Sequence, residues 1–148
     1  MFRMRIPLFC LALSLCGCPE PLLVRENGNR AEVRCIGISD GDTIKVLTDD
    51  KKQMKIRLHG IDCPELGQPF GRKAKQRMSD LCFNKQLVIV EKDKDRYGRM
   101  VAVVFHNKQD VAAILLREGL AWHYRKYDKS KRYAELEKSA RGAAVGLW

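Results

Sequence analysis

The sequence has few of the residues that build structural metal sites. It contains three histidines among 148 residues, and no two of them stand at ligand spacing. Its cysteines show no C-x-x-C pair. Structural zinc uses closely spaced pairs of such ligands, so a zinc-stabilised fold is not expected. The sequence also contains no internal repeat and no low-complexity tract. We therefore expect one globular domain with a core of its own.

Acidic residues are also in the minority. The chain has 18 Asp and Glu against 28 Lys and Arg, for a formal net charge of +10 at pH 7. A basic globular chain favours polyanions, either nucleic acid or an anionic membrane surface, although charge can also serve solubility alone. No helix expected after the N-terminal region shows a large apolar stripe opposite a basic one. A membrane-surface function therefore has little support.

Long apolar runs are absent except near the N-terminus. Residues 1–5 are basic, and residues 6–15 are mostly apolar, a run of about ten residues. A transmembrane helix takes roughly 20 residues, so this run is too short to cross a bilayer. We predict that residues 1–18 are a secretory signal, that residues 19–31 are a polar linker, and that a single domain spans residues 32–148.

The end of this signal resembles a bacterial lipobox. Its sequence is Leu15-Cys16-Gly17-Cys18, which would place the lipid on Cys18. Cysteine at the second position departs from that pattern, and cleavage near Gly17 with release of the chain is the alternative. The expected location is therefore the bacterial periplasm, a membrane as a tethered lipoprotein, or the medium.

Three cysteines lie beyond the signal, at Cys35, Cys63 and Cys82. In an oxidising compartment two of them can pair. Cys35 and Cys82 fall on apolar faces, which equally suits buried thiols. Both readings stay open at the level of sequence.

Short alternating runs predict a mainly β domain. We expect strands over 31–39, 44–48, 53–61, 86–92 and 100–106, the first three as an antiparallel meander. Helical spacing predicts helices over 67–84, 111–118 and 130–140, with Pro69 in the first turn of the first and Asp110 capping the second. Five strands with a helix between the third and fourth match an OB-type barrel, an α+β fold.

The stretch from Arg57 to Glu65 carries the first candidate site. Period-two alternation places Arg57 on the solvent-facing side of its strand. Pro64 cannot donate to a ladder, so the strand is expected to stop near Asp62. Asp62 and Glu65 then offer two carboxylates close to a guanidinium. Oxygen ligands for a hard cation beside a phosphate-binding group are what phosphodiester hydrolysis needs.

Two further motifs flank this stretch. Asp40-Gly41-Asp42-Thr43 precedes it, and an Asp-x-Tyr-Gly-Arg sequence ending at Arg99 follows it. Each alone is typical of a turn or a surface arginine. In this order they resemble the staphylococcal nuclease (thermonuclease) family. The resemblance runs from about Val33 to Trp148 and includes Arg-Glu-Gly-Leu-Ala at 117–121 and the terminal Gly-Leu-Trp.

The resemblance implies one Ca²⁺ ion. Asp42 and Asp62 would be carboxylate ligands, the backbone carbonyl of Cys63 a third ligand, and Asp40 an outer-shell residue. Cysteine before Pro64 departs from the usual family pattern, as does the short loop at 93–97. These departures bear on metal affinity and redox sensitivity rather than on the reaction class.

The resemblance also implies catalytic and substrate-binding residues. Glu65 would be the general base, or the group that orients the attacking water. Arg57 and Arg99 would bind the scissile phosphate and stabilise the charge that develops on it. Tyr97, together with Tyr124 or Tyr127, would contact the substrate, and we expect Trp122 to be a core anchor. No histidine-dependent nuclease motif surrounds His59, His106 or His123.

Family members cleave DNA and RNA to 3′-phosphate and 5′-hydroxyl ends and prefer single-stranded or fraying substrate. The resemblance therefore implies an exported, monomeric, Ca²⁺-dependent endonuclease, with no obligate protein partner evident in the sequence. The alternative is a non-catalytic OB-fold module that binds nucleic acid. Two carboxylates facing a polyanion argue against that alternative, because they repel phosphate unless a cation lies between them.

Overall fold

The computed structural model describes residues 29–148. The predicted secretory signal at 1–18, the lipid site at Cys18 and most of the predicted linker lie outside the described residues. The first strand begins at Arg30, two residues before the predicted start of the domain.

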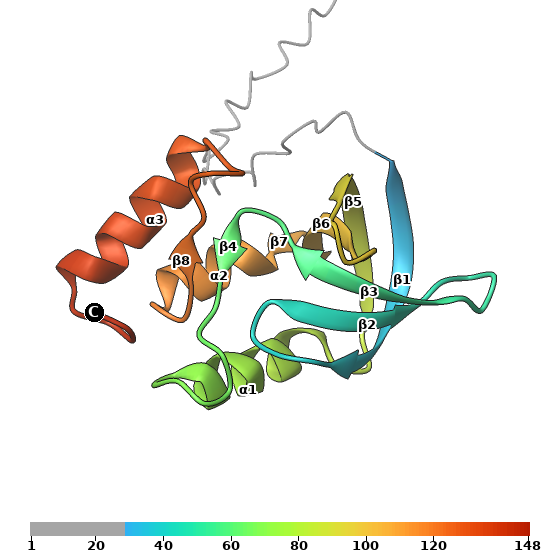
Figure 1. Cartoon of the computed structure of the whole chain (residues 1–148), viewed down its shortest axis with the longest axis horizontal. Helices are drawn as coiled ribbons and strands as arrows, with labels where there is room; N and C mark the ends of the chain where they lie inside the picture. The colour runs from blue at the N-terminus through green and yellow to red at the C-terminus, as the bar shows by residue number, and fades with distance from the viewer. Residues whose placement is uncertain (1–28) are drawn as a thin grey trace, which may run out of the picture.

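Five strands form a closed barrel (Figure 1). The first three, β1 (Arg30–Ile38), β2 (Thr43–Leu47) and β3 (Gln53–Leu58), form the predicted antiparallel meander. β1 also pairs with β5 (Gln86–Lys94), and β5 pairs with β6 (Met100–His106). A parallel pairing between β3 and β6 closes the barrel. Closure leaves these five strands without an open sheet edge.

Three helices and three two-residue strands complete the described chain. These are α1 (Gly71–Cys82), α2 (Val111–Arg117), α3 (Lys131–Gly142), β4 (Ile61–Asp62), β7 (Gln109–Asp110) and β8 (Trp122–His123). The prediction of a mainly β, OB-type barrel with three helices is confirmed. None of the three helices is long and apolar enough to span a membrane.

The prediction of one continuous strand over 53–61 is wrong. β3 ends at Leu58, and a turn through Gly60 separates it from β4. Gly60 has φ +74°, a left-handed conformation that glycine adopts without steric cost. β4 then pairs with β8 instead of continuing along β2. The turn therefore carries Asp62 out of the barrel sheet and toward the C-terminal part of the chain.

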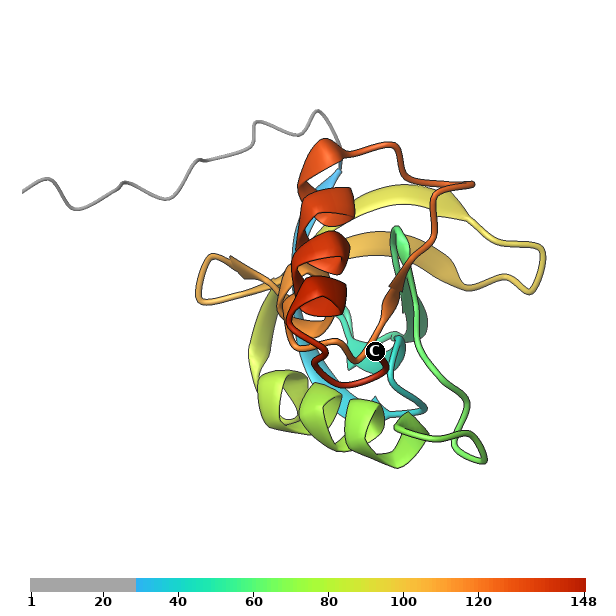
Figure 2. The ribbon, with the colours of Figure 1, turned by 90° about the vertical axis from the view of Figure 1, so that its left-hand side faces the viewer.

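The helices pack against the barrel through one continuous core. Barrel residues such as Ile44 and Ile56 are fully buried, as are Met78 of α1 and Leu116 of α2. Burying one such side chain contributes about 1.5–3 kcal/mol. Asp110 caps α2 as predicted, since its carboxylate accepts a hydrogen bond from the Ala113 backbone N–H at 3.2 Å. α1 and α3 lie on different sides of the molecule (Figures 1 and 2).

Most element boundaries differ from the prediction by a few residues, and two of these differences follow from local geometry. α1 begins at Gly71, so Pro69 lies before the helix rather than in its first turn. Phe70, the residue before the helix, has φ +65°. This left-handed conformation does not belong to an α-helix, so the helix cannot begin before Gly71. β5 continues to Lys94 because a bulge between Glu91 and Asp93 keeps the polar end of the strand paired with β6.

The three cysteines of the described chain are free and buried. Cys35 and Cys82 lie in the core, which agrees with the reading as buried thiols. Burial raises the pKa of Cys82 to about 12, and the nearby Cys35 acts in the same direction. Burial also raises the pKa of Cys63, with Asp42 adding to the effect. Raised pKa values and low exposure both suppress thiol reactivity.

We therefore expect a thiol-specific reagent to leave all three cysteines of residues 19–148 unmodified at pH 8 in the folded protein. Denaturant should expose all three. Rapid modification of the native protein would contradict the burial.

The Cys82 pKa also gives a stability prediction. Between pH 9 and about pH 12 the unfolded chain loses a proton that the folded chain keeps. The free energy of unfolding, measured by denaturant unfolding at each pH, should therefore fall as pH rises through that window.

Candidate active site

Arg57 lies between two of the predicted metal-binding carboxylates. Its Nη1 forms an ion pair with Asp42, and its Nη2 lies 2.7 Å from Oδ1 of Asp62. Nη2 also donates to the Ile61 carbonyl at 3.3 Å. The Arg57 side chain is only 16% exposed, so the prediction that it faces solvent is wrong. The strand alternation was right, but the Arg57 side chain is shielded by Asp42 and Asp62, which it contacts.

Asp42 is the buried centre of this cluster. One carboxylate oxygen accepts from Thr43 Oγ1 at 3.0 Å, and the other accepts from the Cys63 backbone N–H at 3.0 Å. Gly41 makes this approach possible, because an added Cβ would lie 2.8 Å from Cβ of Cys63. The Asp42 N–H donates to Asp40 at 3.2 Å. The loop at 40–43 and the segment at 62–63 are therefore fixed to each other.

Arg99 reaches the same cluster from the β5–β6 loop. Its Nη1 donates to Thr43 Oγ1 at 3.3 Å. Asp95 holds the Arg99 side chain, since its carboxylate accepts from Nε at 2.6 Å and from the Arg99 backbone N–H at 2.9 Å. Burial opposes ionisation of Asp95, but these hydrogen bonds outweigh it and lower its pKa. The exposed Tyr97 ring lies 5.6 Å from the Arg99 guanidinium.

Glu65 projects into solvent from the β4–α1 connection. Its side chain is exposed and has no ion-pair partner within residues 29–148. Its backbone is held firmly: the Glu65 N–H donates to Oε1 of Gln68 at 2.8 Å, and its carbonyl accepts from the Gln68 N–H at 2.8 Å. The Glu65 carboxylate is therefore exposed to solvent while its backbone is fixed.

Gly71 presses against the Glu65 backbone. A Cβ at this position would lie 1.9 Å from the Glu65 carbonyl oxygen, which no side chain can occupy. We expect Gly71→Ala to push the Glu65 segment away and to lower kcat by about 10-fold or more, since Glu65 is the predicted catalytic group and small misplacements of such a group are costly. Steady-state kinetics with a thermal unfolding control would measure this.

Gly142→Ala is the matched control, because nothing lies within 4 Å of an added Cβ there. It should keep parental kinetics and unfold at the same or a higher temperature. Parental kcat in Gly71→Ala would show that this contact does not position Glu65.

The segment after β8 carries two exposed tyrosines. Tyr124 and Tyr127 are 39% and 60% exposed, and their ring centroids lie 4.9 Å apart, edge to face. The Tyr124 N–H donates to the Gly60 carbonyl at 2.8 Å, which ties the segment to the β3–β4 turn. Trp122 is only half-buried, so the prediction of a core anchor is wrong; the neighbouring His123 is buried instead.

Asp128 holds the same two segments together. Its carboxylate lies 2.9 Å from His123 Nε2 and 3.3 Å from His59 Nε2. Burial opposes ionisation, but hydrogen bonds from Ser130 and His123 outweigh it and lower the pKa of Asp128. The sequence offered no signal for this bridge, because His59 lies far from His123 and Asp128 in the chain. The sequence analysis missed Gln68 and Asp95 for a different reason. Both residues lie in or beside the motifs, but the motifs gave no role to them.

Three acidic groups and one guanidinium set the electrostatics of the cluster. Burial raises the pKa of Asp40, and the neighbouring Asp42 charge acts in the same direction. Burial disfavours the charged form of Arg57, but the Asp42 and Asp62 carboxylates outweigh it, and its pKa is raised. Arg57 thus stays charged and balances carboxylates that would otherwise repel each other.

The oxygen donors of the cluster suit a hard cation. Asp42 and Asp62 contact adjacent nitrogens of one guanidinium, so their carboxylates converge on a single positive charge. Ca²⁺ prefers carboxylate, carbonyl and water oxygens. Within residues 29–148 no three side chains of His, Cys, Asp or Glu gather as a metal cluster. An ion here would therefore take its other ligands from backbone oxygens and water.

Comparison with known proteins identifies the family. A family model described as "Staphylococcal nuclease homologue" matches residues 55–148. The chain is 41% identical over 115 residues to an uncharacterized endonuclease of Haemophilus influenzae, covering 78% of this chain and 65% of that one. It is 42% identical over 130 residues to a micrococcal nuclease of Shigella flexneri, covering 80% and 73%.

A plant relative is also similar. The chain is 41% identical over 97 residues to a staphylococcal-like nuclease of Arabidopsis thaliana. The match covers 66% of this chain and 30% of the plant protein. The chain thus spans just under two thirds of the Haemophilus protein and under one third of the plant protein. The matched residues include Arg57, Asp62, Glu65 and Arg99. This chain therefore belongs to the staphylococcal nuclease family, and the prediction of a thermonuclease-type hydrolase is confirmed at the level of the family.

Proposed function

We propose that this protein is an exported, Ca²⁺-dependent endonuclease that hydrolyses DNA and RNA to 3′-phosphate and 5′-hydroxyl ends. One observation carries the proposal: Arg57 and Arg99 both reach the turn at Asp42–Thr43, and Glu65 follows Asp62 and Cys63 in the same segment. Two guanidinium groups, two converging carboxylates and an unpaired carboxylate are the groups that phosphodiester hydrolysis requires.

Arg57 and Arg99 would bind the scissile phosphate. Nη1 of Arg57 is buried and lacks a hydrogen-bond acceptor among the described residues, although it pairs electrostatically with Asp42. Arg99 is oriented by Asp95 and leaves part of its fork free. As water adds to phosphorus, negative charge grows on the phosphoryl oxygens, and fixed donors stabilise that charge without reorganising.

Asp42, Asp62 and the Cys63 carbonyl would hold the Ca²⁺ ion, with Asp40 behind them. When bound, the ion would supply positive charge beside the phosphate and offset the repulsion between these carboxylates and the substrate. The buried Asp42 is fixed by Thr43 and Cys63, which keeps one ligand preformed. Asp62 is 53% exposed and can turn toward an ion with little cost.

Glu65 would accept the proton of the attacking water, or orient that water. The oxygen of water bonds to phosphorus, the bond from phosphorus to the 5′-oxygen breaks, and the leaving oxygen takes up a proton. Tyr97, Tyr124 and Tyr127 are exposed and would stack on bases or sugars of single-stranded substrate. The bases of a nucleic-acid strand can contact these rings only when they are unpaired, which supports single-stranded or fraying DNA and RNA as substrates.

Export rests on the N-terminal sequence. The short basic start and the apolar run at 6–15 support a secretory signal, with lipidation at Cys18 or release as the two outcomes. Export would also separate an enzyme that cuts nucleic acid from the genome of the cell that makes it. No protein partner is needed to complete the cluster, which supports action as a monomer.

The first test is cutting of single-stranded DNA by residues 19–148 with Ca²⁺ and then with excess chelator. Calcium-dependent cutting to 3′-phosphate ends is the expected result. Cutting that survives chelation would reject the metal assignment and keep the enzyme. Binding without cutting in both conditions would favour a non-catalytic OB-fold module instead.

A further inference from the structure

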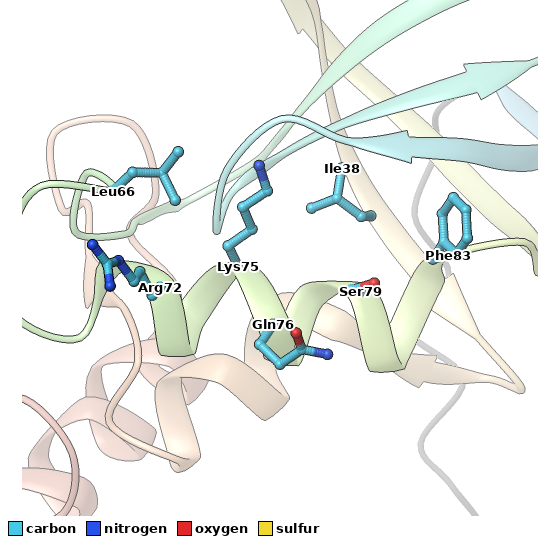
Figure 3. A pocket seen from close by; sticks show the side chains of 7 residues that line it. All are labelled: Ile38, Leu66, Arg72, Lys75, Gln76, Ser79 and Phe83. Atoms are coloured by element: carbon cyan, nitrogen blue, oxygen red, sulfur yellow. The ribbon is translucent and has the colours of Figure 1, made fainter.

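A groove with two uncompensated cations lies beside the candidate active site. It runs between α1 and the end of β1 and has a volume of about 330 Å³ (Figure 3). Its lining includes Ile38, Leu66 and Phe83, with Arg72 and Lys75. This volume falls at the lower end of ligand-binding pockets, which are roughly 300–1,000 Å³. The groove is therefore wide enough for a small part of a ligand.

The charge of the groove is not balanced by protein. The side chains of Arg72 and Lys75 make no ion pair or hydrogen bond within residues 29–148. Other cations of α1 differ, since Arg77 pairs with Glu118 at 2.7 Å and Lys73 lies 5.6 Å from the Phe70 ring. Two carboxylates lie close by: Asp80 accepts a hydrogen bond from Gln76 at 2.9 Å, and Glu65 directly precedes Leu66. Neither of them pairs with Arg72 or Lys75 within the described residues, so both cations of the groove can contact an anion.

The groove also has apolar surface at both ends. Leu66 is 44% exposed at one end, and Phe83 is 50% exposed at the other. Figure 3 shows Lys75 rising from α1 toward the chain near Ile38, between these two apolar side chains. Alternating charge and exposed apolar or aromatic surface is the arrangement that binds single-stranded nucleic acid, with cations on phosphates and flat groups against bases.

The groove adjoins the segment that carries Glu65. Leu66 follows Glu65 directly, and α1 touches the Glu65 backbone at Gly71. Figure 2 shows α1 at the bottom of the molecule, whereas the segment after β8 that carries the exposed tyrosines lies toward the top, with the β4–α1 connection between them. A strand that contacts the tyrosines on one side of the site would reach α1 on the other.

We propose that this α1 groove binds the substrate strand beyond the scissile phosphate, with Arg72 and Lys75 on two successive backbone phosphates. The proposal rests on the proposed nuclease function and adds a second contact region to it. The ligand is single-stranded DNA or RNA, recognised by backbone charge and without base sequence. The groove makes cutting of long strands faster than cutting of short ones.

The test compares the parent protein with the double variant Arg72→Gln/Lys75→Gln on a 4-nucleotide and a 16-nucleotide DNA strand. The ratio of kcat/KM for the long strand over the short one should fall in the variant. Each phosphate contact on a single strand adds about 0.7 to the slope of log affinity against log salt, so the slope for the long strand should decrease by about 1.4. When the salt concentration is lowered from 200 to 50 mM, the affinity of the parent for the long strand should therefore rise about 7-fold more than the affinity of the variant.

The control is Lys131→Gln/Lys138→Gln, which removes the same charge from exposed positions of α3. It should keep the parental ratio and slope. An unchanged ratio and slope in the α1 variant would overturn the proposal, and so would an equal change in the α3 variant, which would reflect net charge alone. Thermal unfolding confirms that each variant is folded. The α1 variant must still cut, so failure of this proposal differs from failure of the nuclease proposal, in which no protein cuts.

Discussion

Glu65→Gln is expected to lower kcat on single-stranded DNA by about 100- to 10,000-fold, the range for loss of a general base. The amide cannot accept a proton from water but fills the same space. Glu65 is exposed and has no ion pair among the described residues, so the fold should not change. The two backbone hydrogen bonds with Gln68 should also persist. Initial rates with Ca²⁺ and a thermal unfolding curve would measure both quantities.

Glu135→Gln serves as the control for Glu65→Gln. Glu135 is an exposed glutamate of α3, so its replacement removes the same charge without touching the cluster. It should cut at the parental rate. If Glu65→Gln also cuts at near-parental rate, Glu65 has no part in the mechanism. A variant that binds DNA at the parental level but does not cut would support the assigned role.

Arg57→Lys is expected to lower kcat/KM by about 100-fold or more, the loss typical of one transition-state donor. A single ammonium cannot reach Asp42, Asp62 and a phosphate together, whereas the guanidinium presents a planar fork. Stability should fall as well. The Asp42 side chain is only 10% exposed, and leaving such a group poorly paired costs about 1–3 kcal/mol. Kinetics and urea unfolding would separate these two effects.

Arg77→Lys tests whether any paired arginine behaves this way. Arg77 forms two hydrogen bonds of 2.7 Å with Glu118 outside the cluster, and its side chain is 35% exposed. Its replacement should cost little stability, because exposed ion pairs contribute about 1 kcal/mol or less. It should also leave catalysis unaltered. Comparable kcat/KM in Arg57→Lys and the parent would exclude Arg57 from phosphate binding.

The strands and helices were predictable because their signals are local. Alternation predicted the meander and β6, and Asp110 marked the start of the helix that became α2. The break in the third strand was not predictable, because Ile61 continues the alternation past Gly60. Only the pairing of β4 with β8, some 60 residues away in sequence, decides that the chain leaves the sheet there.

The candidate site was predictable as a set of residues but not as an arrangement. The order of motifs pointed to Asp42, Arg57, Asp62 and Arg99, and the structure brings these together through direct contacts or through Thr43. The burial of Arg57 depends on the loop at 40–43, which covers it from another part of the sequence. The bridge from Asp128 to two histidines likewise exists only after the chain has folded.

The pairing that closes the barrel also governs when the site can exist. Arg57 stands opposite Thr43 on the preceding strand β2 and opposite Val101 on β6, so one side of its surroundings comes from a segment far along the chain. Contacts of this kind form late and slowly in folding, because long loops must close first. Nuclease activity should therefore return only at the last step of refolding, with no active intermediate. A chain that is exported before it folds would therefore carry no active site past the nucleic acids of its own cell.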